Sequence, residues 1–197
     1  MFNKRHVFFV LLINVFFGMG TACGQSIPSD TPMPENAVNF NPLSIAFGSL
    51  NANYEHLFGG KHGVMVQGGY VFGANSGGYS AALHYRHHYH TKITHNGLSS
   101  PFWGPFVYYE QSDAKVQNTN TSETYTIDIQ YLKFGANWGR RWIFGETFNL
   151  VLRIGYGFPA IAEFDWGESK PEEAETIESI TKIIAGIDGE LSIGFAF

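Results

Sequence analysis

The residues best suited to chemistry alternate along one segment of the chain: His84, Arg86, His88 and His90 occupy every second position. Imidazole nitrogens bind zinc and copper, so metal binding is the first chemistry to consider. If the segment is a strand, three successive alternate positions spread over ~13 Å, which is too far for one ion without ligands from neighbouring strands. No HExxH motif accompanies these residues. We therefore expect no metal site and no cofactor.

Nucleophilic catalysis is the second chemistry that the residue types allow. Ser80 or Ser99, together with His84 or His95 and an acid, could act on lipids at a membrane surface. Serine and histidine are frequent enough in this chain for such combinations to arise by chance. We assign no catalytic residue and expect a protein that is not an enzyme, with a lipid-modifying enzyme as an alternative.

A third group consists of charged residues that share one side of alternating segments: Glu55, Arg86, Lys133, Arg153 and Glu190. If these segments form a small barrel, that side faces the interior, where side chains fill the space. An unpaired buried charge costs several kcal/mol, so these charges must pair. The sequence predicts a structural charge network in the lumen, and a proton relay or small-ion path is the alternative.

The elements that must position these residues are strands, because the hydrophobic period is two in nearly every segment. The last strand is the clearest, with Leu191, Ile193, Phe195 and Phe197 on one face and small residues on the other. Termini of soluble proteins fray in water, whereas the final strand of an outer-membrane barrel has one face in lipid and closes the sheet. We expect this strand to engage the barrel-assembly machinery through Phe197.

About seven alternating segments are clear, and Ala37–Phe47 is the candidate for an eighth, which gives the even number typical of bacterial barrels. A change of apolar phase near Tyr131 suggests a bulge or an end outside the membrane. The short turns His56–Lys61 and Phe144–Glu146 are assigned to the periplasmic side. The sequence predicts an all-β, antiparallel transmembrane barrel of about eight strands.

Residues 112–123, which have little apolar content, and residues 158–186, which break the alternation, are predicted to be extracellular loops. Ser169–Glu172 has the pattern of a capping box with proline in the first turn, and isoleucines follow at helical spacing. We expect a short helix over about residues 170–184, with a strand over Thr176–Ile184 as the alternative.

The N-terminus has the pattern of a secretory signal peptide, with Lys4 and Arg5 followed by an apolar run too short to span a membrane. We assign residues 1–24 to the signal peptide, 25–36 to a periplasmic leader and 37–197 to the barrel. Cys23, the only cysteine, is either removed with the signal peptide or lipidated. In both cases the mature chain forms no internal disulfide. The net charge of −5 argues against a nucleic-acid partner.

This layout resembles the small outer-membrane barrels of the OmpA and OmpX type, and more closely an uncharacterised family of short outer-membrane barrel proteins. The matching stretches are residues 41–44, 53–55, 85–89, 102–106 and 189–195. The resemblance implies an outer-membrane barrel without an established activity. We expect a monomer in contact with lipid and lipopolysaccharide, with a structural or surface-interaction role and no open channel. Binding or passage of a small apolar ligand is the alternative.

Overall fold

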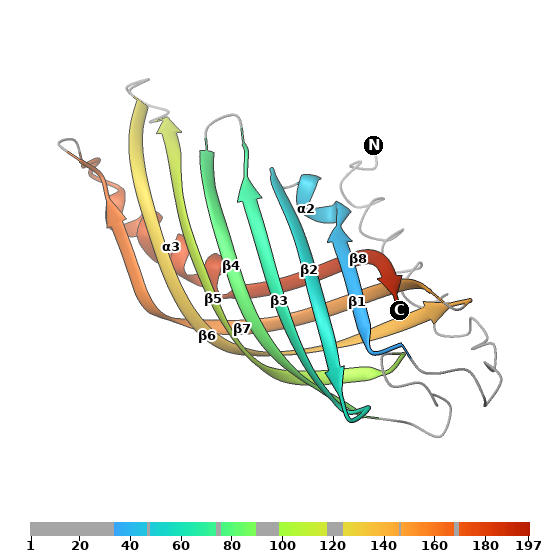
Figure 1. The fold of residues 1–197 in the computed structure, drawn as a ribbon. Helices are drawn as coiled ribbons and strands as arrows, with labels where there is room; N and C mark the ends of the chain where they lie inside the picture. Colours follow the sequence, from blue (N-terminus) through green and yellow to red (C-terminus); the bar gives the residue numbers. More distant parts are fainter. Residues whose placement is uncertain are drawn as a thin grey trace, which may run out of the picture.

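Eight antiparallel strands close into a barrel in which each strand pairs with its neighbours in the chain and β8 pairs with β1 (Figure 1). The computed structural model describes residues 34–46, 48–73, 76–89, 99–117, 124–145, 147–167 and 170–197. The expected signal peptide (1–24) and residues 25–33 of the expected leader lie outside these ranges. Within them, no helix has both the length and the apolar character needed to cross a membrane. The predicted eight-stranded antiparallel barrel with one short helix in its last loop is confirmed.

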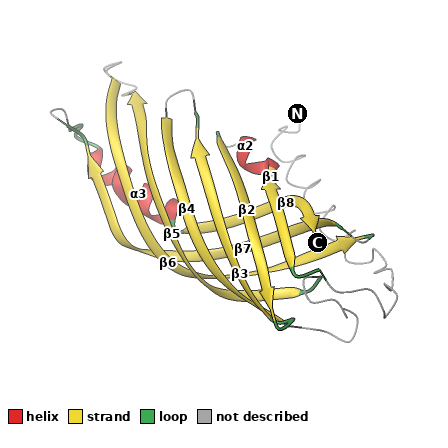
Figure 2. Cartoon of the chain, viewed as in Figure 1, coloured by secondary structure: helices red, strands yellow, loops and turns green. Residues whose placement is uncertain are grey.

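The elements follow one another along the chain in this order: β1 (Asn36–Asn41), α2 (Pro42–Ala46), β2 (Ser49–Phe58), β3 (His62–Val71), β4 (Ser76–His88), β5 (Pro101–Gln117), β6 (Thr124–Phe144), β7 (Phe148–Asp165), α3 (Ala174–Ala185) and β8 (Ile187–Ala196). Both helices lie toward the same end, which we call the helix end (Figure 2). At the opposite, terminal end, the amide N–H groups of Asn36 and Phe197 each donate to the other residue's carbonyl at 2.9 Å. These two hydrogen bonds join the first strand to the last.

The first strand is shorter than the predicted segment Ala37–Phe47. It ends at Asn41, and α2 begins at Pro42 because proline has no N–H for a strand ladder. Asn41 Oδ1 accepts hydrogen bonds from the amides of Leu43 and Ser44, at 3.1 and 3.3 Å, which caps this short helix. The barrel wall is therefore short at β1, which contains only six residues.

The opposite wall is much taller, since β5, β6 and β7 contain 17, 21 and 18 residues (Figure 1). Two loop predictions were wrong here: residues 112–117 belong to β5, and Phe158–Asp165 belongs to β7. Alternation continues in these segments with reversed polarity. Asp113 and Lys115 face outward and are exposed, whereas Ala114 and Val116 pack on the interior cluster at the helix end.

The phase change near Tyr131 reflects the same exchange of the polar and apolar faces of a strand. β6 keeps its odd-numbered residues inward throughout, so Ile127 and Tyr131 are buried on the same side as Lys133. What changes is which face is apolar. A bulge does lie next to this point, as predicted, but its extra residue is Ala160 on β7, opposite the step between Leu132 and Lys133.

The predicted helix is confirmed as α3, and the alternative strand over Thr176–Ile184 was wrong. The capping-box prediction was also wrong: the residue before the helix is Glu173, which makes no side-chain capping bond. The helix is held instead by packing, because Ala174 is buried against Ile127 and Trp166. Trp166 also donates from Nε1 to Glu178 at 2.9 Å.

Candidate functional site

Alternation along four strands turns Glu55 (β2), Arg86 (β4), Arg153 (β7) and Glu190 (β8) into the barrel, where each is at most 4% exposed. Arg86 joins the two glutamates: its Nη1 lies 2.7 Å from Glu55 Oε2 and its Nη2 lies 3.0 Å from Glu190 Oε2. Arg153 Nη1 lies 3.2 Å from the same Glu190 oxygen. The structure thus brings together four of the five charged residues singled out in the sequence.

Two further charged residues belong to this network and were missed. Arg141 Nη2 lies 2.7 Å from Glu55 Oε2, and Arg153 Nε lies 3.1 Å from Asp188 Oδ2. Parity could have found both, because Arg141 has the inward parity of β6 and Asp188 lies two residues before Glu190. We call the six residues Glu55, Arg86, Arg141, Arg153, Asp188 and Glu190 the charge cluster; its three arginines balance its three carboxylates.

The charge cluster spans the lumen in two directions. In an eight-stranded ring, β2 faces β6 and β4 faces β8, so the Glu55–Arg141 and Arg86–Glu190 pairs each cross the full diameter. The Phe102 ring lies 4.3 Å from the Arg86 guanidinium. Buried ion pairs repay their desolvation only when further hydrogen bonds complete them. Glu190 meets this condition, since Asn53 donates to Oε1 at 2.8 Å.

Lys133 lies apart from the charge cluster. Its Nζ donates to the carbonyl oxygens of Ala185 and Ile187, at 2.5 and 3.3 Å, and lies 4.4 Å from the centre of the Tyr108 ring. Cations are favourable at helix C-termini, where carbonyl groups lack intrahelical partners. Lys133 therefore links the end of α3 and the start of β8 to β6, two strands away in the ring.

The histidines of β4 have separate partners. His84 Nδ1 lies 2.9 Å from Asn137 Nδ2, whereas His88 contacts Glu55 Oε1 at 2.8 Å and Ser100 Oγ at 3.0 Å. Among the described residues, no group of three histidine, cysteine or carboxylate side chains has the geometry to hold a metal ion. His90 and His95 lie outside the described residues.

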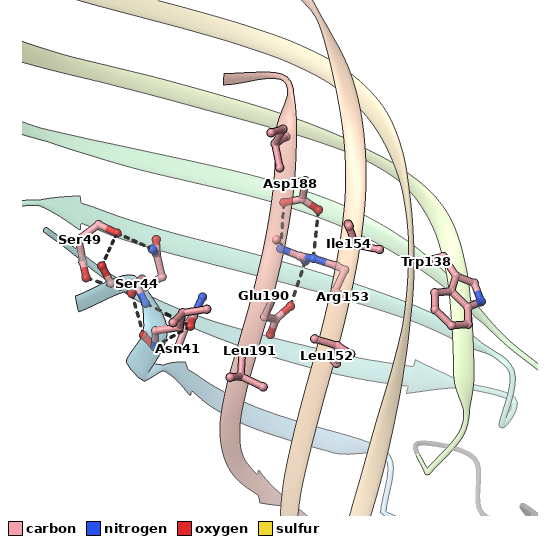
Figure 3. A pocket seen from close by; sticks show the side chains of 14 residues that line it. Asn41, Ser44, Ser49, Trp138, Leu152, Arg153, Ile154, Asp188, Glu190 and Leu191 are labelled. Atoms are coloured by element: carbon pink, nitrogen blue, oxygen red, sulfur yellow. Dashed lines mark hydrogen bonds and ion pairs between the residues drawn. The ribbon is translucent and has the colours of Figure 1, made fainter. Parts of the chain in front are cut away.

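A cleft of about 580 Å³ opens beside the charge cluster, between β8 and the segment formed by α2 and the start of β2 (Figure 3). It exists because β1 pairs with β8 only from Ile193 to Ala196, so residues 187–192 of β8 are paired only on the β7 side. Asn41, Ser44 and Ser49 line one side of the cleft, and Asp188 and Leu191 line the other. The lining includes both inward and outward side chains of β7 and β8.

Fold and interior together define a small, closed antiparallel barrel with paired charges in its lumen. The chain belongs to a family described as protein of unknown function (DUF3575), whose model matches residues 7–192. No curated protein sequence matches the chain. Among solved structures, the chain is similar to the N-terminal β-barrel domain of Pseudomonas aeruginosa OprF, with 11% identity, coverage of 84% of this chain and 100% of that one, and a TM-score of 0.40.

Proposed function

We propose that this barrel spans the bacterial outer membrane, with its terminal end in the periplasm and its helix end outside, and that it has a structural or surface-interaction role without an open channel. The observation that carries the proposal is the band of apolar side chains on the outer face. On β7 this band runs from Phe148 to Ile161 and gives way to Glu163 and Asp165. On β6 it begins at Leu132, beyond Asp128 and Gln130.

The reversal of polarity at the helix end supports the same placement. Above the band, the outer face is polar and the interior is apolar, as in a water-soluble β-protein; within the band, the interior is polar and the outer face is apolar, as lipid requires. The crossing ion pairs of the charge cluster support a closed lumen, because they fill the cross-section at their level. The tall wall of β5–β7, together with α3, forms the surface that projects from the membrane.

The proposal includes the absence of enzymatic activity. Ser80 and His84 share the inward face of β4, but they are four residues apart on a strand and their Cα atoms therefore lie ~13 Å apart. A serine nucleophile needs its base within hydrogen-bond reach. An unchanged lipid profile in a strain lacking the protein is the expected result.

Two arginine substitutions on the same face of β7 test the membrane placement. Ile154 is 64% exposed and lies near the middle of the apolar band, so Ile154→Arg should cost about 2–4 kcal/mol in lipid vesicles. Glu163→Arg lies above the band and should cost roughly 0–1 kcal/mol. The measurement is urea unfolding in vesicles. Equal costs at the two positions would contradict the proposed placement.

The surface role is tested separately by replacing residues 170–185, which include α3, with a short flexible linker. The barrel should still fold, while any phenotype of a strain lacking the protein should not be rescued by the shortened chain. Full rescue would show that this projecting segment has no part in the role.

A further inference from the structure

We propose that the C-terminal half of α3 contacts the membrane: three exposed isoleucines enter the acyl region of the outer leaflet, while the first half of the helix projects into water. This inference rests on the membrane placement proposed above. We call the three residues Ile180, Ile183 and Ile184 the isoleucine strip; they are 52%, 64% and 62% exposed. An exposed apolar flank on an amphipathic helix is typical of a helix that lies at a membrane surface.

α3 occupies the place that a longer β8 would fill. The last residue pair between β7 and β8 is Tyr156–Ile187, although β7 continues further toward the helix end (Figure 1). Just beyond this pair, the amide N–H of Gly157 on β7 donates to the carbonyl oxygen of Gly186 at 2.7 Å, directly after the helix. The helix therefore rises from β8 beside the part of β7 that still carries the apolar band, which ends at Ile161.

The isoleucine strip lies at the height of this band. A helix rises 1.5 Å per residue, so Ile180 is at most ~10 Å above Ile187. A strand tilted by about 45° rises ~2.3 Å per residue, which places Ile161 ~12 Å above Tyr156, the partner of Ile187. Ile180 is therefore no higher than the upper edge of the apolar band. The other two members of the strip lie below that edge, because they are closer to β8 along the helix.

The strip faces away from the barrel interior. Ala174 and Ile183 are separated by about two and a half helical turns, so they lie on opposite sides of α3. Ala174 packs on the interior cluster with Ile127 and Trp166. Ile183 accordingly points away from this cluster, about one turn above Ile187, which lies on the outer face of β8 and is 57% exposed. The isoleucine strip thus extends the apolar outer surface of β8 toward the helix end.

Polarity changes along this side of α3 as it does along β7. Thr176, Ile180 and Ile183 follow one another at i, i+4 and i+7, so they share one side of the helix. All three are exposed, and only the first, which is farthest from β8, is polar. On β7 the outer face changes from Ile161 to Glu163 in the same direction. Two neighbouring elements of different geometry thus become polar toward the helix end, as a common lipid boundary requires.

A membrane fits the isoleucine strip better than a second copy of the chain. A standard protein interface buries ~800 Å² of each partner, and three isoleucine side chains do not supply such an area. The strip is also continuous with the apolar outer face of β8, which lipid covers in the proposed placement. Coverage by protein is therefore the alternative outcome of the test below.

Nitroxide labels at single cysteines test this inference. The full chain carries Cys23→Ser, so that only the introduced cysteine is labelled. Labels at Ile183 and Thr176, on the same side of α3, are compared in dilauroyl phosphatidylcholine vesicles. Oxygen concentrates in lipid and a neutral nickel chelate stays in water, so the logarithm of the ratio of their accessibilities gives the depth of the label. Labels at Ile154 and Glu163 are the references for lipid and for water.

We expect a positive depth parameter at Ile183, close to that at Ile154, and a negative one at Thr176, close to that at Glu163. A negative value at Ile183 would place the strip in water and overturn the inference. Low accessibility to both reagents at Ile183 would show that protein covers the strip, which would also overturn it. A negative value at Ile154 would instead contradict the membrane placement itself.

A charge substitution tests whether lipid contact holds the strip in place. Ile183→Glu puts a carboxylate into the acyl region, where an unpaired charge is costly. A label at Ile184 should then shift to a lower depth parameter, toward the value at Thr176. Thr176→Glu is the matched control on the same side of the helix and should leave the label at Ile184 unchanged. An equal response to the two substitutions would contradict the inference.

Discussion

Glu55 on β2 and Arg141 on β6 start from opposite walls of the barrel and meet in its centre, with Oε2 and Nη2 2.7 Å apart. The same Glu55 oxygen also lies 2.7 Å from Arg86 Nη1, while His88 contacts the other oxygen. One carboxylate thus forms ion pairs with arginines from two different strands. Loss of the Glu55 carboxylate would therefore remove a partner from two buried arginines and one histidine.

Removing one member of such a network leaves other charges buried without a partner. We expect Glu55→Leu to destabilise the barrel by about 3–5 kcal/mol or more, because two arginines lose a partner, and Arg141→Met to cost less. The double variant should be more stable than the sum of the two losses predicts. In it, neither charge of the Glu55–Arg141 pair remains buried without its partner. Urea unfolding in lipid vesicles measures all three. Strictly additive losses would show that the two residues are not energetic partners.

Two strands approach closely at Gly104, so a side chain at this position should be destabilising. A Cβ atom at this position would overlap the carbonyl oxygen of Tyr85 on β4, and Pro105 beside it has no N–H for the ladder. Gly104→Ala should therefore destabilise the barrel by roughly 1–3 kcal/mol, the usual cost of forcing extra volume into a packed site. Gly68→Ala, where nothing lies within 4 Å, is the control and should be nearly neutral.

The terminal aromatic side chain should govern assembly. Phe197 is 62% exposed on the outer face, at the hydrogen-bonded junction with Asn36. Phe197→Ala should reduce the amount of folded, heat-modifiable protein in the outer membrane. Phe158→Ala removes a similarly exposed outer aromatic far from the terminus and should leave this amount unchanged. Equal yields from the two variants would exclude a special role for the last residue.

Docking of α3 should depend on pH through Glu178. The hydrogen bond from Trp166, together with Lys170 at 3.3 Å, holds the pKa of Glu178 below its ordinary value. A depressed pKa contributes stability above the ordinary glutamate range, near pH ~4.3, and this contribution is lost as the pH falls through the lower folded-state value. We therefore expect α3 to loosen on acidification.

Fluorescence of Trp166 reports this change in a variant whose other three tryptophans are phenylalanine. The emission should shift to longer wavelength as the pH falls below the glutamate range. Glu178→Gln should remove that pH dependence, because no carboxylate remains to titrate. A shift that persists in the Gln variant would assign the transition to other groups.

Period-two alternation made the barrel predictable, because one face of each strand points out of the closed sheet and the other points into the lumen. It also located Glu55, Arg86, Arg153 and Glu190 on the inside. Alternation could not predict which of these residues contact one another. Parity fixes the face of the strand on which a side chain lies, but not its position along the barrel axis relative to side chains from other strands. Lys133 is the example: it has the inward parity, but it lies near α3 and outside the charge cluster.

The loop prediction for residues 112–117 failed because of how polar content was interpreted. Residues 112–117 contain many polar side chains, and low apolar content is usually the sign of a loop. In the structure the polar and apolar side chains of this segment alternate between the two faces of β5. Lys115 lies on the outer face and Val116 on the inner face. Toward the helix end β5 exchanges its apolar and polar faces, and this exchange is the signal that was overlooked.

The crossing pairs of the charge cluster also constrain the order of folding. Each joins strands that are four positions apart, so neither can form until the strands between them are aligned and the barrel is closed. Interactions of this kind are absent from early transition states, and their loss mainly accelerates unfolding. The charge cluster would then form late in folding and leave the rate of barrel formation unchanged. Its effect would be to slow unfolding and so lengthen the lifetime of the closed barrel.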